Sequence, residues 1–195
     1  MRITLTAFNM MRHIKTIFEN EICPIKNFYI HSRANNISID TEAAKKQEAA
    51  LIDECNRNKS FQKLGYKFIS IQEYFENYAE SRRKWTPTED LYNGDIVCMD
   101  NKGTYIFIDL KTADKYWLSK QYIGTVTEKS FNAFTNNPDN KLYALASANG
   151  VKLRVISANK IKKLIEHNKL SFIGDNDDKY IKGIDLEKVI DKLNI

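Results

Sequence analysis

The sequence contains little of what zinc-binding, secreted and membrane proteins require. Among 195 residues there are only three cysteines, three histidines, three prolines and seven glycines. Cys23, Cys55 and Cys98 form no CxxC motif and no Cys/His cluster, which argues against a zinc site and predicts free thiols in a reducing cytoplasm. No apolar run is long enough to span a membrane, and the N-terminus lacks the apolar core of a signal peptide.

The charge balance is mildly basic. Lysine and arginine number 30 and aspartate and glutamate 25, which gives a formal net charge of +5. This excess is compatible with a polyanionic partner and equally with ordinary solubility. Hydrophobic residues make up 43% of the chain and charged residues 28%, which is typical of a globular protein. The length predicts a single domain that is large enough to bury a core.

The spacing of apolar residues predicts helices over residues 41–58 and 70–82. Asp40 or Thr41 is the candidate N-cap of the first helix. Residues 1–35 show no clear period. The remaining predicted elements are a largely helical segment at 114–136, strands at 142–147 and 152–157 joined across Asn149-Gly150, an exposed turn at 175–178, and helices at 159–169 and 185–193.

This order of elements predicts a mixed α/β domain around one sheet. We expect residues 1–195 to form one domain, with an N-terminal extension at 1–40, a core at about 41–157 and C-terminal helices at 158–195.

The most informative stretch is GDIVCMDNKGTYIFIDLK at residues 94–111, in which two apolar runs flank a turn. A three-residue loop, Asn101-Lys102-Gly103, usually carries glycine in its last, left-handed position. The resulting register places Asp95 opposite Asp109, and Lys111 on the same face as Asp109.

Two opposed carboxylates destabilise a sheet unless something neutralises them. Lys111 can do so in part, and a divalent cation such as Mg²⁺ can do so more fully, since it is often held by one or two carboxylates together with waters and phosphate. Such a metal activates a bound water and stabilises charge on a phosphate under attack. Lys111 would then orient or deprotonate that water, or stabilise the transition state.

Asp95 followed by Asp109-Leu110-Lys111 on a hairpin resembles the signature of the PD-(D/E)xK nuclease superfamily, which includes most type II restriction endonucleases. The resemblance implies a restriction-endonuclease-like α/β core, with a mixed central sheet and an active-site hairpin flanked by helices. It implies Mg²⁺, replaceable by Mn²⁺, held by Asp95, Asp109 and the main-chain carbonyl of Leu110, and a catalytic role for Lys111. Gly94 stands where the family usually has proline.

Members of this family often place another acid on the helix before the hairpin. A helical period puts Glu48 in the middle of the apolar stripe formed by Ala44, Leu51, Ile52 and Cys55. A carboxylate on a core-facing stripe needs a partner or a metal, so Glu48 is the candidate fourth catalytic residue. The alternative is a helix rotated so that Glu48 is exposed.

Two other interpretations of the hairpin stay open. It could be a surface hairpin with three unrelated charges. Alternatively, Gly103-Thr104-Tyr105 with Tyr122-Ile123-Gly124 resembles the GIY-YIG nucleases, although that family keeps its tripeptides closer together and requires an arginine that residues 125–140 lack.

A nuclease also needs groups that contact DNA. The candidates lie in the segment before the hairpin and in the segment after it: Arg82, Arg83, Lys84, Trp85, Lys115, Lys120 and Gln121. Residues 81–85 could equally be a solvated helix end. The polar residues 31–36 have side chains suited to base edges.

We therefore expect a metal-dependent endonuclease that acts on double-stranded DNA, with a type II restriction enzyme as the first choice. A Holliday-junction resolvase, a phage or transposon-associated nuclease, and a non-catalytic DNA-binding module are the alternatives. Cutting both strands with one site per chain favours a two-fold homodimer.

Overall fold

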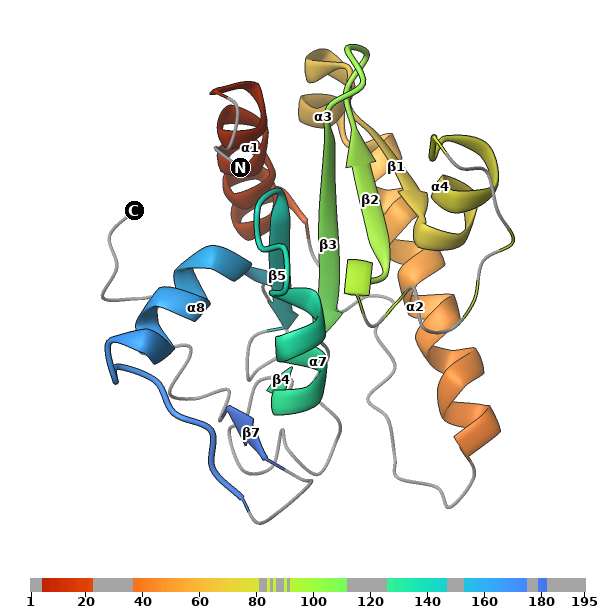
Figure 1. The fold of residues 1–195 in the computed structure, drawn as a ribbon. Coiled ribbons are helices and arrows are strands. Elements are labelled where there is room, and N and C mark those ends of the chain that lie inside the picture. Colours follow the sequence, from red (N-terminus) through yellow and green to blue (C-terminus); the bar gives the residue numbers. More distant parts are fainter. Residues whose placement is uncertain are drawn as a thin grey trace.

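The computed structural model describes residues 5–22, 37–80, 84, 86, 90, 92–111, 126–146, 153–174 and 179–181. This part of the chain contains both helices and short strands (Figure 1). The elements are α1 (Leu5–Glu21), α2 (Ile37–Arg57), α3 (Lys59–Leu64), β1 (Lys67–Ser70), α4 (Ile71–Asn77), β2 (Ile96–Met99), β3 (Tyr105–Lys111), β4 (Val126–Thr127), α7 (Glu128–Phe134), β5 (Lys141–Ala146), β6 (Leu153–Ser157), α8 (Ala158–Glu166) and β7 (Tyr180–Ile181).

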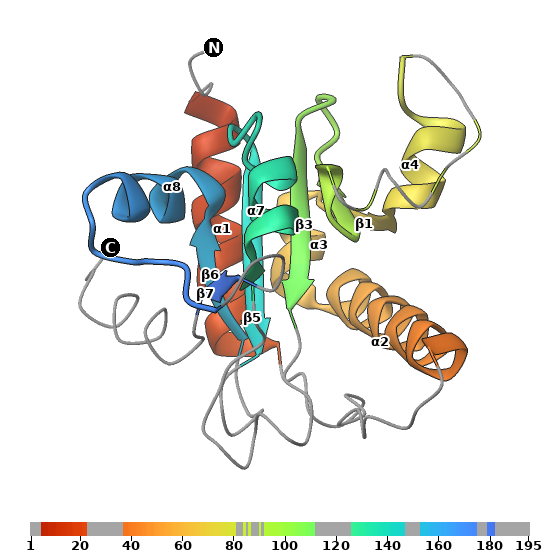
Figure 2. The same cartoon turned by 60° about the horizontal axis from the view of Figure 1, so that its bottom comes forward.

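The centre of the fold is a five-stranded sheet in the order β1-β2-β3-β5-β6. Neighbouring strands are antiparallel except β3 and β5, which run parallel. β4 and β7 form a separate two-stranded sheet. The predicted fold class, a mixed central sheet flanked by helices, is therefore confirmed (Figure 2). No helix in the described ranges has the length and apolar character needed to cross a membrane.

The two faces of the sheet are covered differently. Ile106 and Ile108 of β3 point to one face, where they join a continuous core with α1, α2 and α3. On the other face the apolar residues form two separate clusters, one around α4 and one around α7 and α8. Phe107 of β3 packs against the α4 cluster. The next residue on that face is Asp109, so the polar end of β3 follows directly after an apolar contact.

The first helix corrects the prediction for residues 1–35. Residues 5–21 form α1, which buries one stripe of side chains against the sheet: Ala7, Met10, Met11, Ile14, Ile17 and Phe18. These positions have the i, i+3, i+4, i+7 spacing of an amphipathic helix. The signal was present in the sequence, but the basic residues between the apolar ones obscured it.

The helix predicted at 41–58 begins earlier, at Ile37, so Asp40 and Thr41 lie inside α2 and neither is its cap. Its end is set by Asn58, whose side chain accepts hydrogen bonds from the N–H groups of Ser60 and Phe61 and begins α3. α3 and the short strands β1, β4 and β7 were not predicted. Each has at most six residues, which is too short for a period to show.

Several predicted elements agree with the structure. The second helix is present as α4, although it ends at Asn77, and β5, β6 and α8 match the predictions at 142–147, 152–157 and 159–169. Of 114–136, residues 126–127 form a strand and 128–134 a helix. Residues 135 and 136 form a turn. Residues 114–125, Asn149-Gly150, the turn at 175–178 and the helix at 185–193 lie outside the described residues.

Candidate active site

The hairpin has the loop and the register that the sequence predicts. Residues 101–103 form the turn, and Gly103 has a left-handed φ of 82°. The N–H of Asp100 donates to the carbonyl of Thr104 at 3.1 Å, and β2 then pairs with β3 up to Ile96 opposite Ile108. Local turn chemistry therefore sets which residues meet at the open end of the hairpin.

Beyond Ile96 the chain departs from a regular ladder. The N–H of Asp95 donates at 2.9 Å to the carbonyl of Ile108, the residue that Ile96 already pairs with. Two residues opposite one make a β-bulge, which aims side chains away from the regular direction. Asp95 therefore does not continue the ladder as a directly opposed pair with Asp109. Its carbonyl accepts from the N–H of Ile71 at 3.0 Å, at the start of α4.

Glycine precedes Asp95 for a steric reason. Gly94 has φ of 77°, and a Cβ there would lie 2.7 Å from the carbonyl oxygen of Ile108. Proline, which the PD-(D/E)xK pattern usually has at this position, is locked near −65° and cannot adopt this conformation. The close approach of Gly94 to β3 is what permits the bulge at Asp95.

The Asp95 carboxylate replaces the missing ladder bond. Its Oδ2 accepts a hydrogen bond from the N–H of Leu110 at 2.7 Å. The N–H and C=O of one strand residue point to the same side, so the Leu110 carbonyl is also directed toward the side of β3 where Asp95 lies.

Asp109 and Lys111 form an ion pair on the face of β3 that also carries Phe107. Lys111 Nζ lies 2.8 Å from Asp109 Oδ1. The Asp109 residue is 4% exposed, and its strand neighbour in β5 is Tyr143. Burial by itself would lower the pKa of Lys111, but the carboxylates of Asp109 and Asp95 outweigh burial and raise it. The lysine is therefore held in its charged form.

The other two carboxyl groups have raised pKa values. Burial raises the pKa of Asp95 well above its usual range, the Asp109 carboxylate adds to this, and Lys111 opposes it. The pKa of Glu48 is raised to about 7, mainly by burial and also by the charge of Asp90, while Lys45 opposes the rise. Charges on Glu48 and Asp95 act on each other, so the α2 residue and the hairpin share one electrostatic environment.

Glu48 has the exposure that the helical period predicts. It is partly buried, while Leu51 and Cys55 on the same helix are fully buried in the core. The alternative of an exposed Glu48 beside Lys45 therefore does not hold. Its catalytic role stays a prediction.

Carboxyl groups outnumber ammonium groups at this end of the hairpin. The charges of Asp109, Asp95 and Glu48 all act on Lys111, and the raised pKa values of Asp95 and Glu48 favour their protonated forms. A divalent cation would favour the ionised forms of these carboxyl groups. Within the described ranges no three His, Cys, Asp or Glu side chains converge as a complete metal cage. Two carboxylates, with a carbonyl and waters, are a donor set that suits Mg²⁺ and does not suit a structural zinc ion.

The structure adds a residue that the sequence did not suggest. Tyr143 is fully buried on β5 beside Asp109, and its hydroxyl has no hydrogen-bond partner among the described residues. Burial raises the pKa of this hydroxyl, and the charge of Asp109 raises it further. A tyrosine in an apolar strand looks like a core residue in sequence, so no local signal indicated this position.

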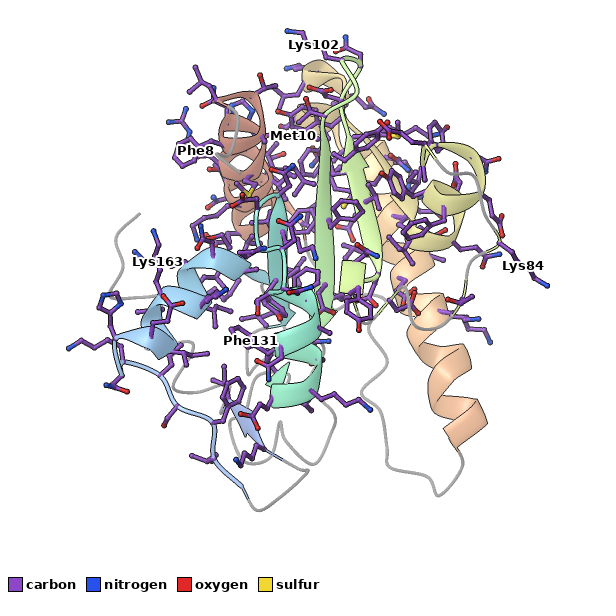
Figure 3. All side chains as sticks on the ribbon, in the orientation of Figure 1. Phe8, Met10, Lys84, Lys102, Phe131 and Lys163 are labelled. Atoms are coloured by element: carbon purple, nitrogen blue, oxygen red, sulfur yellow. The ribbon has the colours of Figure 1, made fainter. Side chains whose placement is uncertain are left out.

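Most of the predicted DNA contacts cannot be placed. Lys84 is exposed and points away from the sheet (Figure 3). The other candidates, together with Tyr122-Ile123-Gly124, the segment 31–36 and Cys23, lie outside the described residues: Arg82, Arg83, Trp85, Lys115, Lys120 and Gln121. Gly103-Thr104-Tyr105 is the hairpin turn and the start of β3. Cys55 and Cys98 are buried free thiols, as predicted.

Comparisons with known proteins add little. The sequence matches no protein-family model and no curated protein. Among solved structures, a nuclease from a fusselovirus is similar with a TM-score of 0.44 and 15% identity, over 83% of this chain and 93% of that chain. A TM-score this low supports no conclusion about the activity of the present chain.

Proposed function

We propose that this protein is a Mg²⁺-dependent endonuclease that hydrolyses phosphodiester bonds in DNA. The observation that supports it most is the buried Asp109–Lys111 ion pair at the open end of the hairpin, whose charges act on the carboxyl group of Asp95. Strongly perturbed carboxyl groups around a fixed ammonium are typical of catalytic sites.

Asp95, Asp109 and the carbonyl of Leu110 would hold the metal, which Mn²⁺ can replace. When bound, Mg²⁺ supplies charge neutralisation at the scissile phosphate and lowers the pKa of a coordinated water. The raised pKa of Lys111 makes it a poor base at neutral pH. Its role is therefore to orient the attacking water and stabilise the negative charge of the transition state by hydrogen bonding.

Glu48, with a pKa of about 7, is suited to exchange a proton or to position a water next to the metal. It would act from α2, while Asp95 directly precedes β2 and the remaining groups come from β3. The site is thus assembled from a helix and a hairpin that are distant in sequence and fixed by the shared core.

For substrate and role, we propose sequence-specific cleavage of duplex DNA by a two-fold dimer, as in a type II restriction enzyme. The resemblance of Asp95 and Asp109-Leu110-Lys111 to the PD-(D/E)xK signature supports this proposal. Arg82, Arg83, Lys84 and Trp85, with Lys115, Lys120 and Gln121, are the proposed DNA contacts. Alanine at Arg82 and Arg83 should weaken binding at all sequences and flatten its salt dependence.

The decisive test is plasmid cleavage with Mg²⁺, with Mn²⁺ and in excess EDTA, followed by sequencing of the ends. We expect discrete cuts with either metal and none in EDTA. Full activity in the chelator would disprove the proposed mechanism. Preferential cutting of four-way junctions would indicate a resolvase, and DNA binding without cleavage under all conditions would indicate a non-catalytic module.

A further inference from the structure

A buried lysine connects β5 to the segment that leads into Asp95. Lys141 is the first residue of β5 and is only 6% exposed. Its Nζ donates to the main-chain carbonyl of Tyr92 at 2.6 Å and to that of Phe134 at 2.9 Å. It also lies 5.0 Å from the centre of the Phe134 ring.

An ammonium is a costly group to bury here. Both of its hydrogen-bond acceptors are uncharged carbonyls, and burial lowers the pKa of Lys141 to about 8. An apolar side chain of similar length would fill the same space without this desolvation cost. What an apolar side chain would lose is the link between two pieces of main chain: the end of α7 at Phe134 and the helical turn at Tyr92.

The position of Tyr92 makes that link relevant to the active site. Two residues after Tyr92, Gly94 lies close to the carbonyl of Ile108. Asp95 is the next residue. Main-chain hydrogen bonds fix Asp95 itself to β3 and to α4. The lysine fixes the residues just before it to β5. Asp95 is therefore anchored on two neighbouring strands of the sheet.

We propose that Lys141 is a positioning residue, which holds residues 92–94 against β5 and thereby keeps the Asp95 carboxylate on the N–H of Leu110. This placement does not depend on the proposed nuclease function. Its consequence for metal binding and cleavage does rest on that function.

The Leu110 amide reports the placement directly, because its N–H donates to Asp95 Oδ2. Spectra of isotope-labelled, metal-free full-length protein should be compared for wild type, Lys141→Met and Lys141→Arg. Lys129→Met, on the exposed side of α7, is the matched control with the same charge loss. In Lys141→Met we expect the Leu110 amide proton to shift upfield and to exchange with solvent about tenfold faster or more. Lys141→Arg should restore both, and Lys129→Met should change neither.

The second readout is the Mg²⁺ concentration that gives half-maximal single-turnover cleavage. Lys141→Met should displace a metal-holding carboxylate and so raise this Mg²⁺ concentration about 10–100-fold. Lys141→Arg should recover part of the wild-type value. A loss of folded protein alone would lower the rate without moving this concentration. If Lys141→Met fails to fold, Lys141→Gln replaces it, since its side chain is one atom shorter and uncharged.

An unchanged Leu110 amide in the Met or Gln variant would overturn the proposal, whatever the cleavage result. If the Leu110 amide resonance shifts but the Mg²⁺ requirement for cleavage stays unchanged, the connection between Lys141 and catalysis is overturned. If the Leu110 amide shifts in the variant but the wild-type protein itself never cleaves DNA, the positioning role stands and the nuclease function is refuted instead.

Discussion

Lys111 Nζ lies 2.8 Å from the Oδ1 of Asp109, two residues earlier on the same strand. Because strand side chains alternate, the two residues share one face of β3. The pair buries its aspartate almost fully and raises the pKa of its lysine. The ammonium is therefore charged and fixed before any substrate binds, which is the preorganisation that electrostatic catalysis requires.

Replacing this lysine should separate chemistry from binding. In Lys111→Ala both carboxylates stay, but the group that orients water is lost, so single-turnover cleavage should fall about 10²–10⁴-fold. DNA affinity in a metal-free gel shift should change little, because phosphate contacts elsewhere dominate it. Lys102→Ala at the exposed tip of the hairpin is the control (Figure 3). Wild-type cleavage by Lys111→Ala would mean that the hairpin is not an active site.

Asp109→Asn should abolish cleavage for a different reason, the loss of a metal-holding charge. It also removes a negative charge that would repel the scissile phosphate, so metal-free DNA binding should become tighter. The measurement is the same pair of assays on purified protein. Cleavage that Mg²⁺ still supports at the wild-type concentration would contradict the assignment of Asp109 as a ligand.

Glu48 predicts a pH dependence of stability. Its pKa is about 7 in the folded protein, against an ordinary value of 4.5. The folded state binds this proton more tightly, so the contribution of Glu48 to stability is complete below pH 4.5 and is lost as the pH rises to about 7.

Glu48→Gln mimics the protonated acid. In EDTA it should be more stable than wild type above pH 7, by on the order of 3 kcal/mol at most, with the difference vanishing near pH 4. Urea unfolding at several pH values measures this, with Glu76→Gln on an exposed part of α4 as control. A pH-independent difference would show that Glu48 ionises normally.

Two glycines allow the steric role of the bulge to be isolated. Gly94 and Gly103 both have left-handed backbones, with φ of 77° and 82°. An added Cβ at Gly103 meets nothing within 4 Å, whereas at Gly94 it would lie 2.7 Å from the Ile108 carbonyl. Gly103→Ala should cost about 1 kcal/mol, and Gly94→Ala clearly more, in unfolding free energy. Equal costs would argue against a close approach at Gly94.

The hydroxyl of Tyr143, which has no hydrogen-bond partner among the described residues, gives the last prediction. Removing a buried polar group that has no partner should be neutral or stabilising, by up to about 1–3 kcal/mol. Thermal or urea unfolding of metal-free Tyr143→Phe tests this. A marked destabilisation would mean that the hydroxyl has a partner in the protein.

The sequence by itself determined the hairpin and what it carries. The turn type depends on Gly103, and the face to which each side chain points follows from the alternation of side chains along a strand. Both are set by residues that are neighbours in sequence. That Asp95 lies at the same end of the hairpin as Asp109 and Lys111 was therefore predictable, although their direct opposition was not borne out, and the helical period predicted the partial burial of Glu48. The bulge at Asp95 was not predictable from the sequence, because it forms where Gly94 contacts the opposite strand.

Only the tertiary structure decided what surrounds that hairpin. The parallel pairing of β3 with β5 joins strands separated by a long connection, and no local pattern encodes which strands become neighbours. That pairing puts Tyr143 beside Asp109 and brings Lys141 to the carbonyl of Tyr92, 49 residues away in sequence. Such contacts form because burying the apolar faces of the sheet favours one packing of the whole chain, and side chains far apart in sequence meet only within that packing.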